Sequence, residues 1–210
     1  MIRKISLILS LILTTILAKS QESKFRIGVG LKAIESSFSS DELTNYGFNR
    51  ALSAIFLVDY LLTDNLFISS GVEYEKKGAT GDVLIPINEA YYISASSTYH
   101  LHFIQLPLLA TYKTKGNLRF FGNLGINFGY LFDQSLTNDS GIYSRVQTNF
   151  DEFELSLIFG GGLEVDLWSR FDLAIGIRNN RGLTELESAN GAVAIETNTL
   201  GVLLHLSYNL

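Results

Sequence analysis

Hydrophobic and polar residues alternate strictly along one central segment of the chain. Between Leu118 and Phe132, every even position except Gly122 is bulky and apolar, while the odd positions are mostly polar or small. Successive side chains of a β-strand point to opposite faces, so this pattern predicts a strand with one apolar and one polar face. The pattern recurs along the chain and predicts eight strands: Phe25–Ile34, Arg50–Leu61, Leu66–Lys76, Tyr99–Lys113, Asn117–Phe132, Glu152–Asp166, Arg170–Asn179 and Glu196–Asn209.

The connections between these strands alternate between short and long. Tight turns at one end and long loops at the other are typical of a transmembrane β-barrel, with the turns in the periplasm and the loops outside the cell. Both termini of the barrel then lie on the periplasmic side. The short connections are Leu62–Asn65, Thr114–Gly116 and Leu167–Ser169, and the long ones are Glu35–Asn49, Lys77–Thr98, Asp133–Asp151 and Asn180–Ile195.

The start of the chain has the features of a secretory signal peptide. Arg3 and Lys4 precede an apolar run from Ile5 to Leu17, and Ala18-Lys19-Ser20 supplies small residues for cleavage. The apolar run is shorter than the roughly 18–20 residues that a membrane-spanning helix needs. We therefore predict a signal peptide over residues 1–20 and a single barrel domain over residues 21–210.

Composition narrows the chemistry of the exported chain. The 210 residues include no cysteine, which excludes disulfides, thiolate chemistry and the common zinc frameworks. The leader contains three basic and no acidic residues, so its removal shifts the formal charge from −5 to about −8. A surplus of acid argues against nucleic acid as a partner. The sequence predicts neither a cofactor nor a metal.

Alternation alone does not distinguish a membrane barrel from a soluble lipocalin-like barrel, which carries its apolar row inside. The polar row favours the membrane barrel, because it mixes charged residues of both signs with many glycines. Small residues suit the crowded interior of a narrow barrel, whereas a soluble exterior has no steric reason to favour glycine. These glycines are Gly28, Gly30, Gly71, Gly125, Gly129, Gly160, Gly162, Gly176 and Gly201.

Aromatic residues near the short turns also favour the membrane barrel. Such a set, gathered at one height of the apolar row, indicates an interfacial girdle at headgroup level. Lipid offers no hydrogen-bond partners, so membrane-spanning strands must close on themselves, and eight strands close a barrel that side chains can fill. The predicted fold is an all-β, eight-stranded antiparallel up-and-down transmembrane barrel. The girdle residues are Tyr60, Tyr112, Phe120, Phe171 and Tyr208, with Trp168 in the adjacent turn.

One strand carries a resemblance to a known family. Phe103-Ile104-Gln105-Leu106-Pro107-Leu108-Leu109 resembles the proline-containing strand of the Bacteroidetes outer-membrane β-barrel family that includes the PorT-like proteins. Gly122-Asn123-Leu124-Gly125 and Gly160-Gly161-Gly162-Leu163-Glu164 support the resemblance, which extends over the mature chain. It implies an eight-stranded outer-membrane barrel but no single activity, since some members are linked to protein secretion. The chain departs from other outer-membrane proteins by ending in Tyr208-Asn209-Leu210 instead of phenylalanine.

Charged residues of both signs occupy the polar row. Charges inside a filled barrel must pair or are strongly penalised, so we predict a salt-bridge network that plugs the lumen. The alternative is a gated path for ions or small solutes, with Arg119 and Arg178 as basic elements and Glu164 and Asp166 as acidic ones. The predicted inward set is Arg26, Lys32, Lys113, Arg119 and Arg178 facing Asp59, Glu73, Glu75, Glu152, Glu154, Glu164, Asp166 and Asp172.

Two histidine-containing motifs have residue types that are found in metal or catalytic sites. His100-x-His102 places two imidazoles on one face of a strand, a spacing that can chelate a metal, but no third ligand completes a site. His205 and Ser207 with nearby acids suggest a hydrolase site only in outline. Both residues face inward near the periplasmic end, away from the outer leaflet. We therefore predict no catalytic residues.

The sequence predicts a non-enzymatic, integral outer-membrane protein of a Gram-negative cell. Its role is structural or is exerted through long extracellular loops, which carry Tyr46, Tyr91, Tyr92 and Tyr143. The alternatives are an accessory component of a secretion or envelope-assembly system, a porin-like small-solute channel and an outer-membrane lipid-modifying enzyme. The expected partners are outer-membrane lipid and envelope or secretion proteins, with a monomer favoured.

Overall fold

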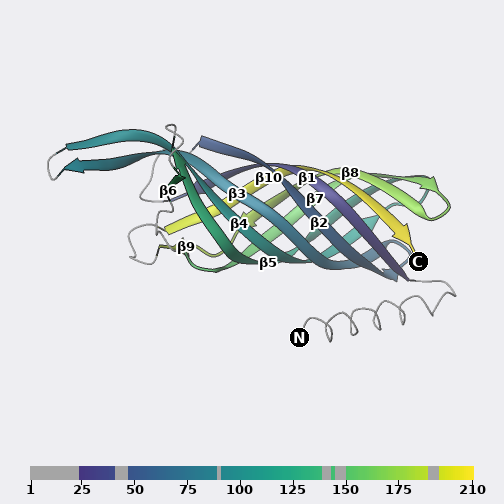
Figure 1. Ribbon diagram of the computed structural model, residues 1–210. Helices are drawn as coiled ribbons and strands as arrows, with labels where there is room; N and C mark the ends of the chain where they lie inside the picture. The colour runs from purple at the N-terminus through teal and green to yellow at the C-terminus, as the bar shows by residue number, and fades with distance from the viewer. Residues whose placement is uncertain (1–23, 41–46, 89–90, 139–142, 145–149, 189–193) are drawn as a thin grey trace, which may run out of the picture.

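The computed structural model folds the chain into a long barrel (Figure 1). It describes residues 24–210 except 41–46, 89–90, 139–142, 145–149 and 189–193, and the side chains of 82–95, 138 and 143–144 are also outside the description. The predicted signal peptide lies outside the described residues. The long strands are β1 (Phe25–Ser39), β2 (Gly47–Thr63), β3 (Leu66–Asn88), β4 (Tyr91–Lys113), β5 (Leu118–Asn138), β7 (Phe153–Trp168), β8 (Phe171–Gly182) and β10 (Ala194–Asn209).

These eight strands pair in sequence order, and all the pairs are antiparallel. The last strand returns to the first: Arg26 of β1 lies opposite Asp59 of β2 on one side and opposite Asn209 of β10 on the other. The wall therefore closes without a free edge, which satisfies the backbone hydrogen bonds where water is absent. The predicted eight-stranded antiparallel barrel is confirmed.

The apolar row of each strand lies on the outer wall. Leu124 and Phe128 of β5 are 58% and 52% exposed, whereas Asn127 between them is fully buried in the lumen. The polar interior excludes the lipocalin-like arrangement, in which the apolar row would line the inside. Among the described residues, no helix is both long enough and apolar enough to cross a bilayer.

The predicted loop Lys77–Thr98 is wrong, because β3 and β4 continue through it as one hairpin. Pairing of β3 with β4 runs from Leu66↔Tyr112 to Asn88↔Tyr91. Valine, isoleucine and tyrosine are frequent in this segment, and they favour extended chain. A bulge between Pro86 and Asn88 accommodates the proline, which cannot donate to a ladder. Figure 1 shows the hairpin projecting from the long-loop end, opposite the C-terminus.

Other strands also extend beyond their predicted ends on the long-loop side. β5 continues to Asn138 past an irregularity beside His102, and β8 continues to Gly182. Two short strands lie at this end: β6 (Tyr143–Ser144) pairs with β5, and β9 (Leu186–Glu187) pairs with β10. Above the membrane neither face of the wall meets lipid, so these segments are polar in composition. They lack the alternation from which strands were predicted.

Candidate functional site

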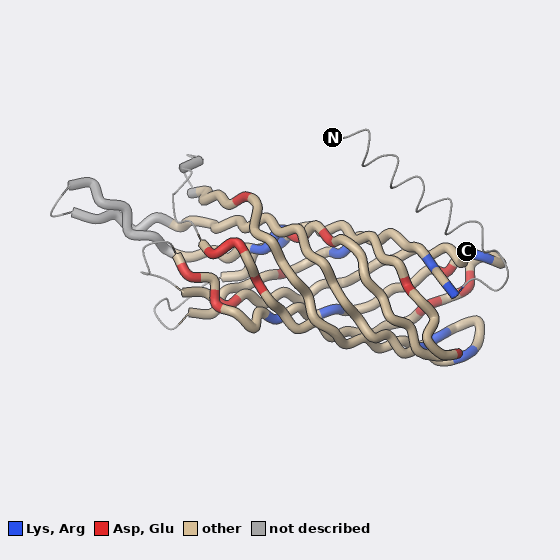
Figure 2. Tube along the Cα trace, turned by 90° about the horizontal axis from the view of Figure 1, so that it is seen from below, with Lys and Arg blue, Asp and Glu red and all other residues tan. Residues whose placement is uncertain are grey.

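Charged side chains fill the lumen in successive layers along its length, and Figure 2 shows acidic and basic positions distributed along the barrel. The layer nearest the short turns centres on Arg26. Its guanidinium binds Asp59 at 2.7 Å and both Glu164 and Asp172 at 3.2 Å. These carboxylates come from β2, β7 and β8, so one cation connects strands across the barrel.

Two further cations complete this layer. Lys113 Nζ lies 2.5 Å from Glu164 Oε2, and Arg119 Nη2 lies 3.0 Å from both Glu164 and Asp172. Arg119 also pairs with Asp166, whose side chain is 40% exposed at the rim. Asp166 is thus a partner of the network but is not enclosed in the lumen as predicted. Glu152 is exposed just before β7 and lies outside the interior set.

The middle layer lies farther from the short turns. Lys32 Nζ contacts Glu73 at 2.5 Å and also pairs with Glu75, while Arg178 Nη1 lies 3.7 Å from Glu73. Thr199 donates a hydrogen bond to Glu75 at 3.0 Å. All these charged side chains are at least nine-tenths buried, so each carboxylate depends on its protein partners.

A third layer, nearest the long loops, was not predicted from the sequence, because Lys77 was assigned to a loop. Its side chain is fully buried, pairs with Glu154 and donates to Thr197 at 3.0 Å. The ammonium also lies 4.9 Å from the centre of the Phe103 ring. The sequence did contain a signal for the inward position of Lys77, since this residue continues the alternation of the inward-facing Glu73 and Glu75.

The enclosed charges balance. In the described part of the chain, six cations and six anions line the lumen: Arg26, Lys32, Lys77, Lys113, Arg119 and Arg178 with Asp59, Glu73, Glu75, Glu154, Glu164 and Asp172. Each of them takes part in an ion pair. Paired charges fill space and fix strand register, and this enclosed set has no formal net charge.

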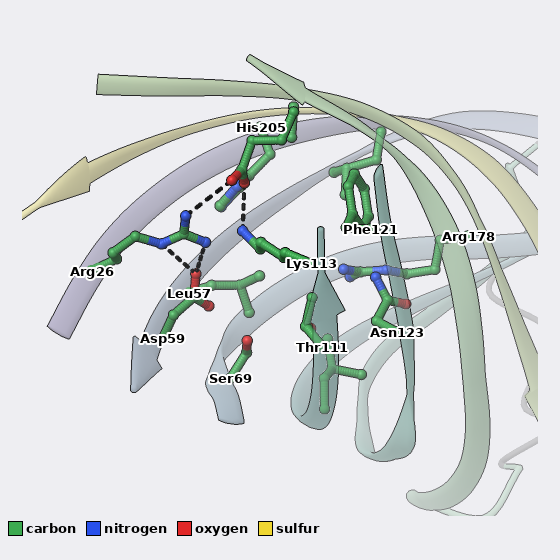
Figure 3. A pocket seen from close by; sticks show the side chains of 14 residues that line it. Arg26, Leu57, Asp59, Ser69, Thr111, Lys113, Phe121, Asn123, Arg178 and His205 are labelled. Atoms are coloured by element: carbon green, nitrogen blue, oxygen red, sulfur yellow. Dashed lines mark hydrogen bonds and ion pairs between the residues drawn. The ribbon is translucent and has the colours of Figure 1, made fainter. Parts of the chain in front are cut away.

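A cavity of about 40 Å³ lies between the first and middle layers (Figure 3). Arg26, Lys113, Asn123, Arg178 and His205 are among the residues that line it. Within the described residues, Asn123 Oδ1, Arg178 Nε and His205 Nε2 have no hydrogen-bonding protein partner. A space of this size with several polar atoms on its wall suits a few water molecules, which would satisfy these atoms.

Apolar side chains close the lumen beyond the third layer. Leu101, Phe103 and Leu131 project inward from β4 and β5 and pack with residues of the chain segments above them. This mouth cluster is almost fully buried, so it separates the ion layers from the long-loop end. Its buried members are Phe38, Ala79, Leu101, Phe103, Leu131, Phe150, Leu186 and Ile195.

The predicted girdle residues lie on the outer wall near the short turns. Phe25 and Tyr60 have ring centroids 5.1 Å apart, and Phe171 lies 5.0 Å from Tyr208. Tyr112 and Phe120 are 57% and 62% exposed. Trp168 ends β7 rather than lying in the turn, and its ring meets Phe171 edge-on at 6.1 Å.

A second aromatic group, which the sequence reasoning missed, lies on the outer wall toward the long loops. Tyr74 lies 6.3 Å from Phe132, and Tyr130 lies 5.4 Å from Phe153. The two aromatic groups mark the two interfaces expected of a membrane barrel. These residues are far apart in the sequence and come together only because neighbouring strands place them side by side. No short sequence motif therefore identifies them.

On the outer wall, His102 lies at this upper group, and His100 lies two positions farther along β4 toward the long loops. The Tyr74 hydroxyl lies 2.7 Å from His102 Nδ1. Beyond the interface, burial and the nearby Lys76 and His102 lower the pKa of His100 to about 4. Among the described residues, no three His, Cys, Asp or Glu side chains cluster as a metal site would require.

His205 and Ser207 lie inside the lumen near the short turns, as predicted. Ser207 Oγ is 3.2 Å from His205 Nδ1, and both side chains are buried. The enclosing wall separates this pair from the outer leaflet and the cell surface. A serine hydrolase needs its nucleophile accessible to substrate, and this arrangement does not provide that access.

Comparisons with known proteins address the family and the fold. The model of the family described as "Outer membrane protein beta-barrel domain" matches residues 19–187. No curated protein sequence matches the chain. Neisserial surface protein A (NspA) is 15% identical with a TM-score of 0.50, covering 88% of this chain and 97% of its own. This likeness supports the small-barrel fold and nothing further.

Two other solved structures are similar at lower scores. Ail, the attachment invasion locus protein of Yersinia pestis, is 11% identical with a TM-score of 0.40, covering 87% of this chain and 99% of its own. The outer membrane protease OmpT from Escherichia coli is 8% identical with a TM-score of 0.49, covering 90% of this chain and 98% of its own. Neither likeness bears on the activity of this chain.

Proposed function

Because the chain belongs to the outer membrane protein beta-barrel domain family, we propose that it is a non-enzymatic surface-binding protein of the outer membrane. In this proposal the barrel is a closed anchor, and the extracellular end binds a partner macromolecule. The lumen conducts no solute.

The projecting β3–β4 hairpin is the observation that carries the proposal. In the described part of the chain, β3 pairs with β2 only as far as Thr80, and β4 pairs with β5 only as far as Ser97. The remaining residues of β3 add about 25 Å of extended chain. A barrel that served only as a membrane anchor has no need of such an extension, whereas loops on a rigid scaffold commonly bind partners.

The filled lumen supports the rest of the proposal. Paired charges and the mouth cluster occupy the path that a solute would take. The buried His205 and Ser207 pair has no route to substrate. These features favour binding at the surface over transport or hydrolysis.

Site-specific cross-linking tests binding at the hairpin. The chain has no cysteine, so Ser96→Cys introduces a single thiol where β4 leaves the barrel. After a thiol-reactive photo-crosslinker is attached on intact cells, we expect discrete adducts of higher mass. Lys115→Cys, in the turn between β4 and β5, is the matched control. With the cross-linker attached after the outer membrane is permeabilised, it should give none of these adducts. Identical adduct patterns from both variants would contradict the proposal.

Single-channel recording tests the channel alternative. We expect planar bilayers containing the purified wild-type barrel to show no stable conductance steps. Reproducible steps would favour the small-solute channel and count against a closed anchor.

The resemblance to PorT-like proteins supports a second proposal, an accessory role in protein secretion. It rests on the strand around Pro107 and on the glycine-rich segments of β5 and β7. Deletion of the gene should then lower the amount of secreted protein, and envelope proteins should co-purify with the barrel. Normal secretion in the deletion strain would leave surface binding as the function.

A further inference from the structure

A groove of about 700 Å³ crosses the outer wall of the barrel. It runs over β8, β10, β1, β2 and β3, from Leu173 near the short turns to Tyr74 at the upper aromatic group. Its lining residues lie on the lipid side of the wall, except Gly30 and Ile55, which belong to the inward-facing row. The lining residues are Val29, Gly30, Leu31, Ala54, Ile55, Phe56, Val72, Tyr74, Leu173, Leu204 and Leu206.

A small residue creates the hollow. Ala54 lies between Leu31 of β1 and Tyr74 of β3 in the strand register, and Phe56 follows it on the same face. The larger side chains form walls around the methyl group of Ala54. A larger side chain at this one position would therefore fill part of the groove without touching the lumen.

The groove has a polar end. Tyr74 lines it and hydrogen-bonds to His102, and Lys76 follows Tyr74 two positions along the same face of β3. Within the described residues, Lys76 forms no ion pair with a carboxylate, although Asp133 lies opposite His102 in the register. An unpaired ammonium beside an aromatic interface is suited to a phosphate group.

We propose that this groove binds one acyl chain of an anionic, phosphate-bearing lipid of the outer leaflet, with the phosphate at Lys76. The wall around the groove faces hydrocarbon, so its natural occupant is a lipid chain. The four strand spacings between β8 and β3 correspond to about 19 Å measured across the strands. This length is comparable to one leaflet of a hydrocarbon core roughly 30 Å thick.

The shape of the groove favours a lipid over a protein partner. Packing, rather than hydrophobic transfer, drives specific association within a bilayer. A helix with its side chains is about 10 Å wide. The hollow at Ala54 is flanked by Leu31 of β1 and Tyr74 of β3, and a flexible acyl chain can follow this uneven surface more closely than a rigid helix can. This inference does not depend on the proposed surface-binding function.

Native mass spectrometry of the purified full barrel provides the test. The barrel in detergent is titrated with palmitoyl-oleoyl phosphatidylglycerol, and with the matching phosphatidylcholine as the neutral probe. We expect one phosphatidylglycerol to be retained by the wild type. Ala54→Phe should lower that occupancy about tenfold, equivalent to about 1.4 kcal/mol. Ala110→Phe, at another lipid-facing alanine outside the groove, should retain the lipid as the wild type does.

A second pair of variants locates the headgroup. Lys76→Gln should remove the preference for phosphatidylglycerol over phosphatidylcholine, whereas Arg170→Gln, at the opposite end of the wall, should preserve it. Loss of the preference in Arg170→Gln alone would overturn the outer-leaflet assignment. Because Lys76 and Arg170 lie outside the groove itself, these variants keep the test decisive if Ala54→Phe folds poorly.

Other outcomes would overturn the groove itself. Equal retention of phosphatidylglycerol by the wild type and a folded Ala54→Phe variant would do so. Equal loss of the lipid in Ala54→Phe and Ala110→Phe would also do so, because it would indicate general annular lipid. A lipid-free dimer disrupted by Ala54→Phe would assign the groove to a second copy of the chain instead.

Discussion

Lys77 is a fully buried cation whose ammonium contacts Glu154 and Thr197 in the layer nearest the long loops. Arg50 and Glu35 also form an ion pair, at 2.9 Å, but the Arg50 side chain is 84% exposed. The same kind of contact therefore has different energetic consequences at the two sites. A buried charge that loses its partner has no water to replace it, whereas an exposed one does.

Replacing Lys77 by methionine should strongly destabilise the barrel. Glu154 would be left buried and unpaired, which costs about 3–5 kcal/mol. Urea unfolding in lipid vesicles measures the change in the free energy of unfolding. Arg50→Ala should have little effect, and Lys77→Met combined with Glu154→Gln should recover most of the lost stability. A double variant no more stable than Lys77→Met would contradict this explanation.

His100 should remain neutral in acid because its folded-state pKa is lowered to about 4. The unfolded chain takes up the proton near pH 6.5, the ordinary value, so acid favours unfolding between about pH 6.5 and 4. NMR of isotope-labelled histidine gives the pKa directly. In His100→Gln this part of the pH dependence of stability should vanish. A measured pKa near 6.5 would show that His100 is freely solvated.

At the scale of elements, β5 shows how glycine lets neighbouring strands approach. A Cβ added to Gly125 would lie 2.0 Å from the carbonyl oxygen of Leu108 and 2.8 Å from Leu109 Cα. Both atoms are backbone of β4, so neither can rotate away. A Cβ added to Gly122, three positions earlier on the same strand, would lie 3.9 Å from its nearest neighbour, the backbone oxygen of Gly160.

Gly125→Ala should therefore destabilise the barrel by about 1–3 kcal/mol through overpacking. The shift of the folded band in an SDS gel with temperature measures the fraction of folded barrel. Gly122→Ala on the lipid-facing side is the matched control and should behave as the wild type. Equal stability of the two alanine variants would mean that β4 moves aside at little cost.

At the scale of the molecule, the barrel has two unlike ends. The short turns lie at one end with the C-terminus, and the hairpin projects from the other (Figure 1). In an outer-membrane barrel the short turns face the periplasm. The apolar wall between the two aromatic groups then spans the bilayer, with the ion layers enclosed behind it.

This orientation predicts the accessibility of introduced thiols. A membrane-impermeant maleimide should label Ser96→Cys on intact cells, because the β4 end of the hairpin lies outside. It should label Lys115→Cys only after the outer membrane is permeabilised. Labelling in the opposite order would require an inverted barrel, and labelling of both thiols on intact cells would show that the envelope was not intact.

Alternation along the chain, together with the composition of its polar row, was sufficient to predict the membrane barrel. Each strand has one apolar face, and the polar partner faces contain glycine and charges of both signs, which only an enclosed interior explains. For this reason the inward positions of Arg26, Glu73, Glu164 and Arg178 followed from parity along their strands. Strand ends above the membrane did not follow, because the wall there has no lipid-facing side and its alternation fades.

Only the tertiary structure decided which distant residues meet. Arg26 contacts Glu164, 138 positions away, because closure of β1 on β10 brings their layers together. Register between strands likewise decides three other features. It brings Lys77 into the ion layers, and it assembles the mouth cluster and the groove over Ala54. A pattern within one strand specifies the face of each residue, but not the height at which another strand places its partner.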